Sequence, residues 1–203
     1  MDKLKLEFSF DDGGKYDFKI IELLKKYKQI ATFYIPTMND LSEPEIVVMS
    51  KVFQIGGHTT THPEDLKKLS QEEQYNEIKY NKDYLEQLIG KKINSFCYPG
   101  GKYNEITIEQ VKKAGYKEAR TTNILYIKEP ENKYRKHTTI HIKPDRREYK
   151  EKNWLKCAIR LFDKTNALKQ GYFHCWGHSK EIIQYNILNE FEKLLKYIYE
   201  KRK

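Results

Sequence analysis

Cysteine is scarce in this 203-residue sequence, in which only Cys97, Cys157 and Cys175 occur and no CxxC pair is present. An odd number of widely spaced cysteines argues against a disulfide framework and favours a reducing compartment. Long apolar runs are also lacking: the longest aliphatic run, residues 46–49, is far too short to span a membrane. No apolar signal core precedes the first strand-like pattern. We therefore expect a cytoplasmic protein without a transmembrane segment.

Strong local charge is missing from most of the chain. Lys and Arg number 38 against 29 Asp and Glu, and the resulting formal charge of +9 is spread along the sequence. The most basic stretch, residues 128–160, holds eleven basic and five acidic residues but no recognised nucleic-acid motif. We therefore expect no nucleic-acid partner. Only 38% of the residues are apolar, but 16 Tyr and nine Phe supply enough area for a core.

Short β-branched and aromatic segments alternate with segments of helical periodicity along the chain. The predicted strands cover residues 4–10, 30–35, 53–57, 95–98, 117–121, 138–142 and 172–176. The predicted helices cover residues 18–27, 43–52, 70–90, 104–114, 147–169 and 186–199. This alternation implies βαβ units and a parallel sheet, which can close as a barrel. Because no repeat, low-complexity segment or linker interrupts the pattern, we expect one α/β domain over residues 1–203.

The first candidate site is Asp11-Asp12-Gly13-Gly14, which follows the strand at residues 4–10. Strand ends are where α/β proteins place catalytic groups. Adjacent carboxylates point in different directions, so one can bind a metal ion while its neighbour transfers protons. Taken alone, an Asp-Gly pair is more often a simple turn.

The second candidate is the pair His58 and His62, which lies between Gly56-Gly57 and Pro63. Two imidazoles four residues apart converge on one ion when the segment turns. The glycines allow a sharp bend, and the hydroxyls of the intervening threonines can orient the rings. On these residues alone, metal binding and a structural role are equally good interpretations.

A third segment, Tyr98-Pro99-Gly100-Gly101, follows a predicted aromatic strand. Its glycines leave backbone N–H groups free to face a ligand. By itself, a plain strand-to-helix loop is the simpler interpretation.

A fourth segment, Trp176-Gly177-His178, ends the last predicted strand. A histidine in this position can act as a general acid near neutral pH. A surface or capping role is equally open for it.

Taken together and in this order, the four segments resemble the polysaccharide deacetylase (NodB-homology) family, carbohydrate esterase family 4. Residues 10–13 are similar to the family's first motif and residues 58–62 to its second. The segment at Pro99 resembles the third motif, and residues 176–178 resemble the fifth. The resemblance implies a distorted (β/α) barrel with a metal site at the carboxyl ends of the strands.

The resemblance also implies catalytic roles. Asp12, His58 and His62 would hold one divalent ion, most simply zinc, with cobalt, nickel and manganese as alternatives. Asp11 would be the general base that accepts a proton from the attacking water. His178 would protonate the departing amine.

Three further residues receive substrate-binding roles from the same resemblance. The backbone N–H of Gly100 would donate to the oxyanion, and Tyr98 would lie beside it in the third motif. Trp176 would line the slot for the acetyl methyl group.

The sequence departs from the family pattern at two points. The third motif normally carries an Arg that braces the catalytic Asp, but Cys97 stands there. We expect Arg120, at the end of the strand at residues 117–121, to reach in instead. The acidic residue of the fourth motif, which orients the acid histidine, has no counterpart, since neither Asp145 nor Asp163 has matching neighbours.

A second histidine, His174, competes with His178 for the role of general acid. It lies deeper in the same predicted strand. We prefer His178, because the ends of barrel strands face the active site and their interiors do not.

These residues predict a metal-dependent hydrolase of an amide. The resemblance implies that the amide is the N-acetyl group of an amino-sugar glycan or glycan precursor and that acetate is released. An amide resists water, and a divalent ion with three protein ligands supplies both a Lewis acid and an activated nucleophile. Two alternatives are a C–N hydrolase acting on a non-sugar amide and a non-catalytic glycan-binding protein of the same fold. In a cytoplasmic enzyme, a nucleotide- or lipid-linked sugar would meet Arg146 and Arg147 with its phosphate. The exact glycan, the metal and the oligomeric state stay open.

Overall fold

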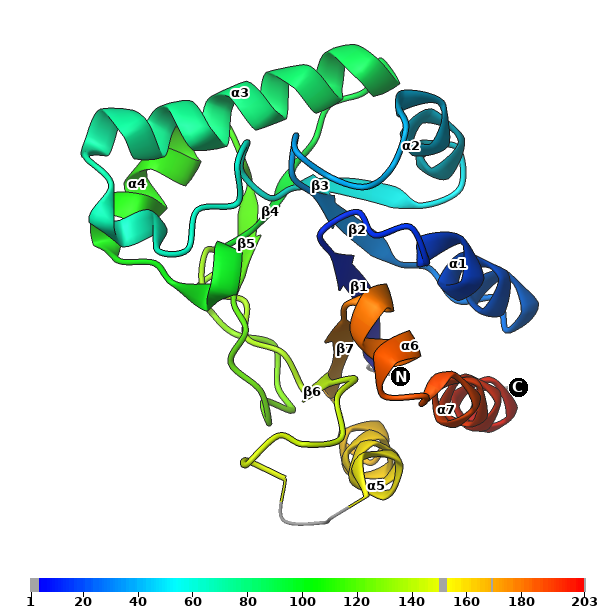
Figure 1. The fold of residues 1–203 in the computed structure, drawn as a ribbon. Coiled ribbons are helices and arrows are strands. Elements are labelled where there is room, and N and C mark those ends of the chain that lie inside the picture. The colour runs from blue at the N-terminus through cyan, green and yellow to red at the C-terminus, as the bar shows by residue number, and fades with distance from the viewer. Residues whose placement is uncertain (1–3, 150–152, 169, 203) are drawn as a thin grey trace.

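The computed structural model describes residues 4–149, 153–168 and 170–202, and within these ranges seven parallel strands form one curled sheet (Figure 1). Their spatial order is β5-β4-β3-β2-β1-β7-β6. The strands are β1 (Lys5–Asp11), β2 (Thr32–Ile35), β3 (Gln54–Gly57), β4 (Ser95–Cys97), β5 (Glu118–Arg120), β6 (Ile140–His141) and β7 (Tyr172–Gly177). The predicted distorted (β/α) barrel is therefore confirmed.

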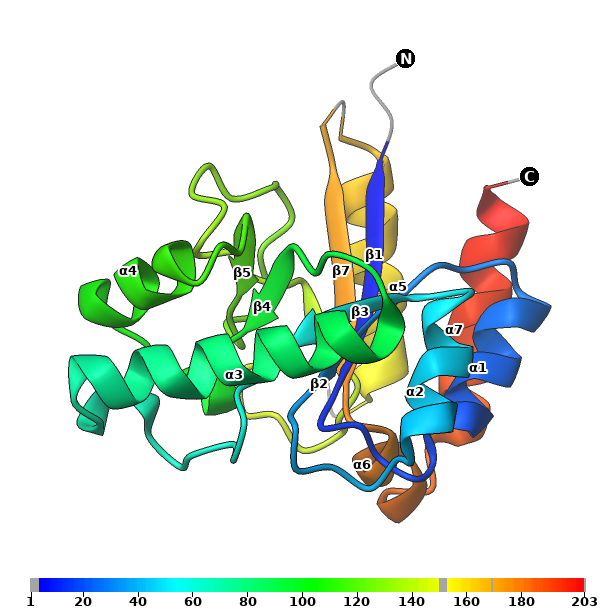
Figure 2. The ribbon, with the colours of Figure 1, turned by 90° about the horizontal axis from the view of Figure 1, so that it is seen from above.

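The helices lie on the outside of this curled sheet, as Figure 1 shows. They are α1 (Asp17–Lys26), α2 (Glu43–Ser50), α3 (Gln71–Ile89), α4 (Glu105–Lys113), α5 (Trp154–Asn166), α6 (Ser179–Gln184) and α7 (Leu188–Lys201), with 3₁₀ helices η1 (Leu66–Lys68) and η2 (Pro99–Gly101). All paired strands are parallel. Most connections between them pass through a helix of the outer layer, whereas the connection from β5 to β6 is a loop without a helix. Figure 2 shows α6 at the opposite end of the molecule from the start of β1.

Side chains of β1 alternate between the helical layer and the interior of the barrel. Phe10 stacks on Phe33 with ring centroids 5.4 Å apart and meets Phe191 of α7 edge-on at 5.9 Å. Ser9 and Asp11 point the other way and contact polar groups of the interior. This period-two pattern buries aromatic rings under the helices and delivers carboxylates to the barrel.

One segment closes the gap between the two edges of the sheet. Lys136 pairs with β5 through a backbone hydrogen bond from its N–H to the carbonyl of Ala119, 2.9 Å long. A few residues later, Thr139 donates from its N–H to the carbonyl of His174 in β7, also at 2.9 Å. The same segment therefore borders both β5 and β7, and the curled sheet encloses an interior.

The structure differs from the predicted elements mainly in the last third of the chain. The helix predicted at residues 147–169 begins instead at Trp154, because the Asn153 side chain accepts a 3.0 Å hydrogen bond from the N–H of Lys156 and caps that start. Residues 150–152 and 169 of that prediction lie outside the described ranges. Helix α6 was not predicted, since six residues are too few to reveal a helical period.

In the described part of the chain, no helix combines the length and the apolar character that crossing a bilayer requires.

Candidate active site

Asp11 and Asp12 diverge at the carboxyl end of β1. Asp11 is the last residue of the strand and its side chain is buried at 3% exposure. Asp12 has a φ of +78°, and its N–H donates to the carbonyl of Tyr34 at 3.0 Å. This left-handed turn leaves the Asp12 carboxylate 48% exposed at the mouth of the barrel.

Asp12 meets His58 and His62 in one cluster. Oδ1 of Asp12 lies 3.4 Å from Nε2 of His58 and 3.5 Å from Nε2 of His62. The donor atoms of the three residues all lie within 4.8 Å of one another. The chain reaches this geometry through positive φ angles at Thr59 (68°) and His62 (54°), which coil the loop after β3 back toward Asp12.

Helix α3 anchors the loop that carries these histidines. Oε2 of Glu77 accepts hydrogen bonds from the N–H groups of Thr60 and Thr61, each 2.9 Å long. Oδ1 of Asn81 accepts from the N–H of His58, also at 2.9 Å. Two successive turns of α3, one with the partly buried Glu77 and one with the buried Asn81, therefore hold the loop in place.

The residues of this cluster fit a divalent cation. Nδ1 of His58 lies 2.8 Å from the carbonyl oxygen of Cys97 and donates to it, so Nε2 is the nitrogen presented to Asp12. Two imidazoles and a carboxylate form a common zinc donor set, and N–O separations near 3.4 Å match bonds of roughly 2.0–2.2 Å to a tetrahedral ion. Burial alone would raise the pKa of Asp12, but the hydrogen bond with His58 and the charge of His178 hold that pKa well below its usual range.

Asp11 forms a buried ion pair with Arg120. Nη2 of Arg120 contacts Oδ2 of Asp11, and the two side chains are only 1% and 3% exposed. The same nitrogen lies 2.9 Å from Sγ of Cys97, and the guanidinium sits 4.6 Å above the ring of Trp176. Arg120 thus approaches Asp11 past the small thiol that stands at the family's Arg position.

The electrostatics keep Asp11 ionised. Burial by itself would raise the pKa of Asp11, but the charges of Arg120, His58 and His178 outweigh it and lower the pKa. Oδ1 of Asp11 has no hydrogen-bond partner among the described residues. Asp11 therefore presents one unoccupied acceptor oxygen in the barrel.

His178 lies on the other side of Asp12. Its Nε2 is 3.7 Å from Oδ2 of Asp12, and its Nδ1 is 2.6 Å from Oε2 of Glu181. Burial would lower the pKa of His178, but the hydrogen bond to Glu181 and the charges of Asp11 and Asp12 raise it. This histidine is therefore favoured in its protonated form.

Glu181 is the contact of His178 that the sequence did not reveal. It lies in α6, three residues beyond the histidine, and it also accepts from Nε2 of His141 at 3.1 Å and from Nζ of Lys143 at 2.8 Å. The only available signal was the acidic residue at i+3 from His178. Asp145 and Asp163 bond instead to the hydroxyls of Tyr185 and Tyr197.

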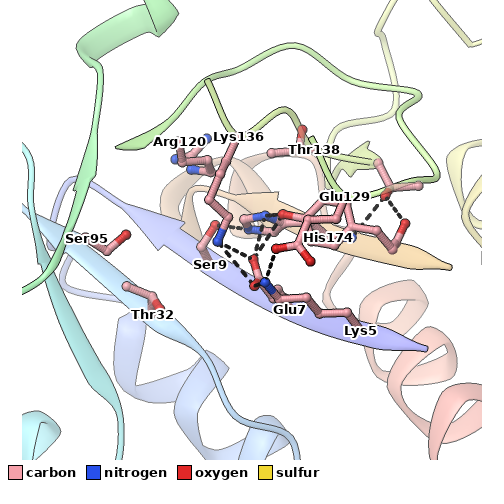
Figure 3. A network of polar contacts seen from close by, with 12 residues as sticks. Lys5, Glu7, Ser9, Thr32, Ser95, Arg120, Glu129, Lys136, Thr138 and His174 are labelled. Carbon is pink, nitrogen blue, oxygen red and sulfur yellow. Dashed lines mark hydrogen bonds and ion pairs between the residues drawn. The ribbon is translucent and has the colours of Figure 1, made fainter. Parts of the chain in front are cut away.

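His174 lies away from this cluster, in the polar network of Figure 3. Its Nε2 is 2.8 Å from Oγ of Ser9, and its Nδ1 is 2.7 Å from the hydroxyl of Tyr172. It pairs in register with Glu7, four residues before Asp11 on β1, which corresponds to roughly 13 Å along the strand. Burial lowers its pKa to about 3. Geometry therefore favours His178 over His174 as the acid.

The predicted substrate-binding residues lie at the site to different degrees. Gly100 falls in η2 directly after β4, with a φ of +57° that suits glycine. Trp176 lies beside His178 with ring centroids 5.6 Å apart, but it is only 3% exposed. Tyr98 is fully buried, and its hydroxyl donates to the carbonyl of Tyr134 at 3.0 Å, so we do not retain its side chain as a substrate contact.

A cavity of about 320 Å³ opens next to the cluster. Its wall includes Asp11, Asp12, Gly14, Lys15, Tyr16, Pro36, Met38, Asn39, Asp40, His62, His178, Ser179 and Lys180. Both acids, one histidine of the cluster and His178 thus face the same space, which is large enough for a sugar ring.

The fold and the arrangement of these groups at the strand ends define a barrel of the NodB type. Over 98% of its length the chain superposes on a carbohydrate esterase family 4 pseudoenzyme from Bacillus anthracis, with a TM-score of 0.68, 15% identity and 62% of that chain covered. At this identity the likeness concerns the fold. The family model described as polysaccharide deacetylase matches residues 1–119, more than half of the sequence, and this chain belongs to that family.

Two relatives share more of the sequence over a shorter span. A peptidoglycan-N-acetylglucosamine deacetylase of Bacillus cereus is 30% identical over 115 residues, which cover 55% of this chain and 53% of that protein. A Streptococcus pyogenes deacetylase, PplD, solved in complex with acetate, is 32% identical with a TM-score of 0.52, over 57% of this chain and 54% of that one. The chain spans about half the length of the curated relatives it matches.

Proposed function

We propose that the protein is a metal-dependent N-deacetylase that releases acetate from an N-acetylated amino sugar. One observation carries this proposal: an ionised acid with an unoccupied oxygen, Asp11, and a carboxylate-paired histidine, His178, flank the group of Asp12, His58 and His62. This arrangement offers a base, an acid and a cation site around one cavity. Metal-assisted amide hydrolysis uses all three.

The cation, most simply zinc, would be held by Asp12, His58 and His62 and would supply Lewis acidity toward the amide carbonyl. Oδ1 of Asp11 accepts the proton of the attacking water, while Arg120 holds the opposite oxygen of the same carboxylate. The ion pair keeps Asp11 charged and fixes its direction.

His178 delivers a proton to the departing amine nitrogen, which is otherwise a poor leaving group. Glu181 stabilises the protonated ring through Nδ1 and directs Nε2 toward Asp12 and the cavity. The backbone N–H of Gly100 is our candidate donor to the developing oxyanion, and Trp176 is the candidate wall for the acetyl methyl.

The relatives support a sugar substrate. The B. cereus protein is described as acting on N-acetylglucosamine of peptidoglycan, and the S. pyogenes enzyme was solved with acetate. We propose the same chemical class, an N-acetylated glycan or glycan precursor. Three buried cysteines without a disulfide suit a reducing compartment, which supports the cytoplasm as its location.

The test is acetate release by protein reconstituted with one equivalent of zinc, cobalt, nickel or manganese. The substrates are N-acetylglucosamine oligomers and, in parallel, small cyclic amides. Acetate together with an equal amount of new free amine from the oligomers supports the proposal. Turnover of cyclic amides alone would make the protein a C–N hydrolase of another class. Oligomer binding without any turnover would make it a glycan-binding protein.

A further inference from the structure

A second group of metal-ligand type adjoins the candidate active site. His141 comes from β6, His178 follows β7, and Glu181 comes from α6, yet their donor atoms all lie within 4.8 Å of one another. Oε2 of Glu181 is 2.6 Å from Nδ1 of His178 and 3.1 Å from Nε2 of His141. Strand β6 and the junction between β7 and α6, which are far apart in the sequence, thus bring two imidazoles to one carboxylate oxygen.

The direction of each donor suits a cation. The ring of His141 stacks on Trp176 with centroids 3.9 Å apart and planes at 4°, which fixes its Nε2 toward Glu181. Burial lowers the pKa of His141 to about 4, so its ring is neutral at physiological pH. Two imidazoles and a carboxylate form a zinc donor set, and bonds of about 2.0–2.2 Å need donors about 3.2–3.5 Å apart. The spacing of 3.1 Å between His141 and Glu181 is close to this range, and the hydrogen-bonded spacing of 2.6 Å between His178 and Glu181 must widen when an ion replaces the proton.

We propose that His141, His178 and Glu181 form a second, weaker binding site for zinc and similar divalent ions, and that an ion bound there switches off His178. The inhibitory part rests on the proposed function, in which His178 is the proton donor. The binding part does not depend on any activity.

Two contacts make this site weaker than the site at Asp12. Nζ of Lys143 lies 2.8 Å from Oε1 of Glu181, so a cation already neutralises the carboxylate. Nδ1 of His141 is buried and has no hydrogen-bond partner among the described residues. When an ion binds Nε2 of His141, the ring proton must lie on Nδ1, which has no hydrogen-bond acceptor there, and this costs free energy. The site at Asp12 therefore fills first, and the second site fills only at excess metal.

The inhibition follows from the proton balance at His178. In the active form both ring nitrogens carry a proton, and Nδ1 donates to Glu181. An ion on Nδ1 displaces that proton to the solvent and leaves a neutral imidazole with one proton on Nε2. This ring no longer has an acidic proton to give to the leaving amine, so turnover falls while the cation at Asp12 stays in place.

The experiment counts zinc ions on the full chain by equilibrium dialysis and elemental analysis, from equimolar to large excess zinc. The parent, His141→Phe and the control His137→Phe are compared. His141→Phe keeps a flat ring against Trp176 but removes the ligand nitrogen, whereas His137 packs against Tyr126 with tilted rings and belongs to neither group. We expect two ions in the parent and the control, with at least a tenfold difference between the two dissociation constants, and one ion in His141→Phe. One ion in the parent, or two in His141→Phe, would overturn the proposal.

Two further variants and an activity measurement sharpen the result. His141→Gln serves if His141→Phe fails to fold, and Lys143→Met should tighten the second site severalfold because it removes the competing cation. Once a substrate is known, excess zinc should lower the rate of the parent below its rate with one equivalent of zinc, whereas the rate of His141→Phe should be the same at both zinc levels. Loss of inhibition without loss of the second ion would overturn the switch. If no substrate is turned over, the proposed function fails, and the ion count still decides the second site.

Discussion

Arg120 and Asp11 meet in an ion pair that is almost fully buried and that lies directly under the mouth of the barrel. The Arg comes from the end of β5, whereas the family's third motif would place it on the neighbouring strand β4, at the position of Cys97. Cys97 and Arg120 are register partners on β4 and β5, so a guanidinium from β5 can reach the same acid past the small thiol of Cys97.

This ion pair predicts the effect of removing Arg120. Arg120→Ala leaves the Asp11 carboxylate buried without its counter-charge, which costs about 3–5 kcal/mol of folding stability. Arg120→Lys keeps a charge but loses the planar guanidinium, so we expect it to fold and to lower kcat by at least tenfold with little change in KM. Chemical denaturation and steady-state kinetics check both variants. Arg120→Ala with the parent's turnover would contradict the positioning role.

Glu181 sets the alkaline limit of activity in our account. Its hydrogen bond and charge raise the pKa of His178, and activity should be lost as pH rises through that pKa because the acid form disappears. Glu181→Gln removes the negative charge, so the pKa of His178 falls and the alkaline limb of kcat/KM moves to lower pH. A pH profile checks this. A limb that stays in place would separate Glu181 from the protonation of His178.

The buried carboxyl group of Asp17 should make the free energy of unfolding depend on pH. It is fully buried at the start of α1, and neither carboxylate oxygen has a hydrogen-bond partner in the described ranges. Burial, reinforced by the charges of Asp12 and Asp11, raises its pKa to about 7. The unfolded chain ionises this group near pH 3.9. Between about pH 4 and 7 the folded state therefore holds the extra proton, and stability falls as pH rises.

The variant Asp17→Asn isolates this effect. Relative to the parent it should gain stability from pH 4 to pH 8, by up to about 4 kcal/mol for a shift of roughly three pKa units. Denaturation is measured on chelator-treated protein, because a cation at Asp12 would lower the pKa of Asp17. A stability difference that does not change with pH would contradict the raised pKa.

Glu77 should contribute to zinc affinity, because it restrains the loop that carries His58 and His62. Its carboxylate accepts hydrogen bonds from the N–H groups of Thr60 and Thr61, directly before His62. Glu77→Ala should weaken zinc affinity by about 10- to 100-fold without removing a ligand. Glu72→Ala, on the exposed part of the same helix, is the matched control and should bind zinc as the parent does. Equal affinities in both variants would place the restraint on the loop elsewhere.

The sequence predicted the parts of this site that local patterns encode. Asp12, His58 and His62 follow strand ends, so a parallel barrel was bound to bring them to one edge. Arg120 was predictable because it ends a strand of the same sheet and can therefore supply the guanidinium that is missing at the position of Cys97. Glu181 was missed because it lies in a helix of six residues, which is too short to show a helical period. His141 was missed because it depends on the contact between β6 and β7, which no local pattern reveals.

Tyr98 illustrates the opposite error. Its place in the third motif suggested a substrate contact, but strand alternation turns the ring into the protein, where it stacks on Tyr103 with centroids 4.5 Å apart. Motif position therefore located the loop correctly and left the direction of the side chain undetermined.

The central claim is that Asp12, His58 and His62 form a metal centre, and its most direct test is the ion content of the parent and of His58→Ala. Both proteins are reconstituted identically with zinc and passed through a desalting column to remove weakly held ions. We predict about one ion per chain in the parent and none in His58→Ala. No ion in the parent, or equal content in the two proteins, would contradict the account.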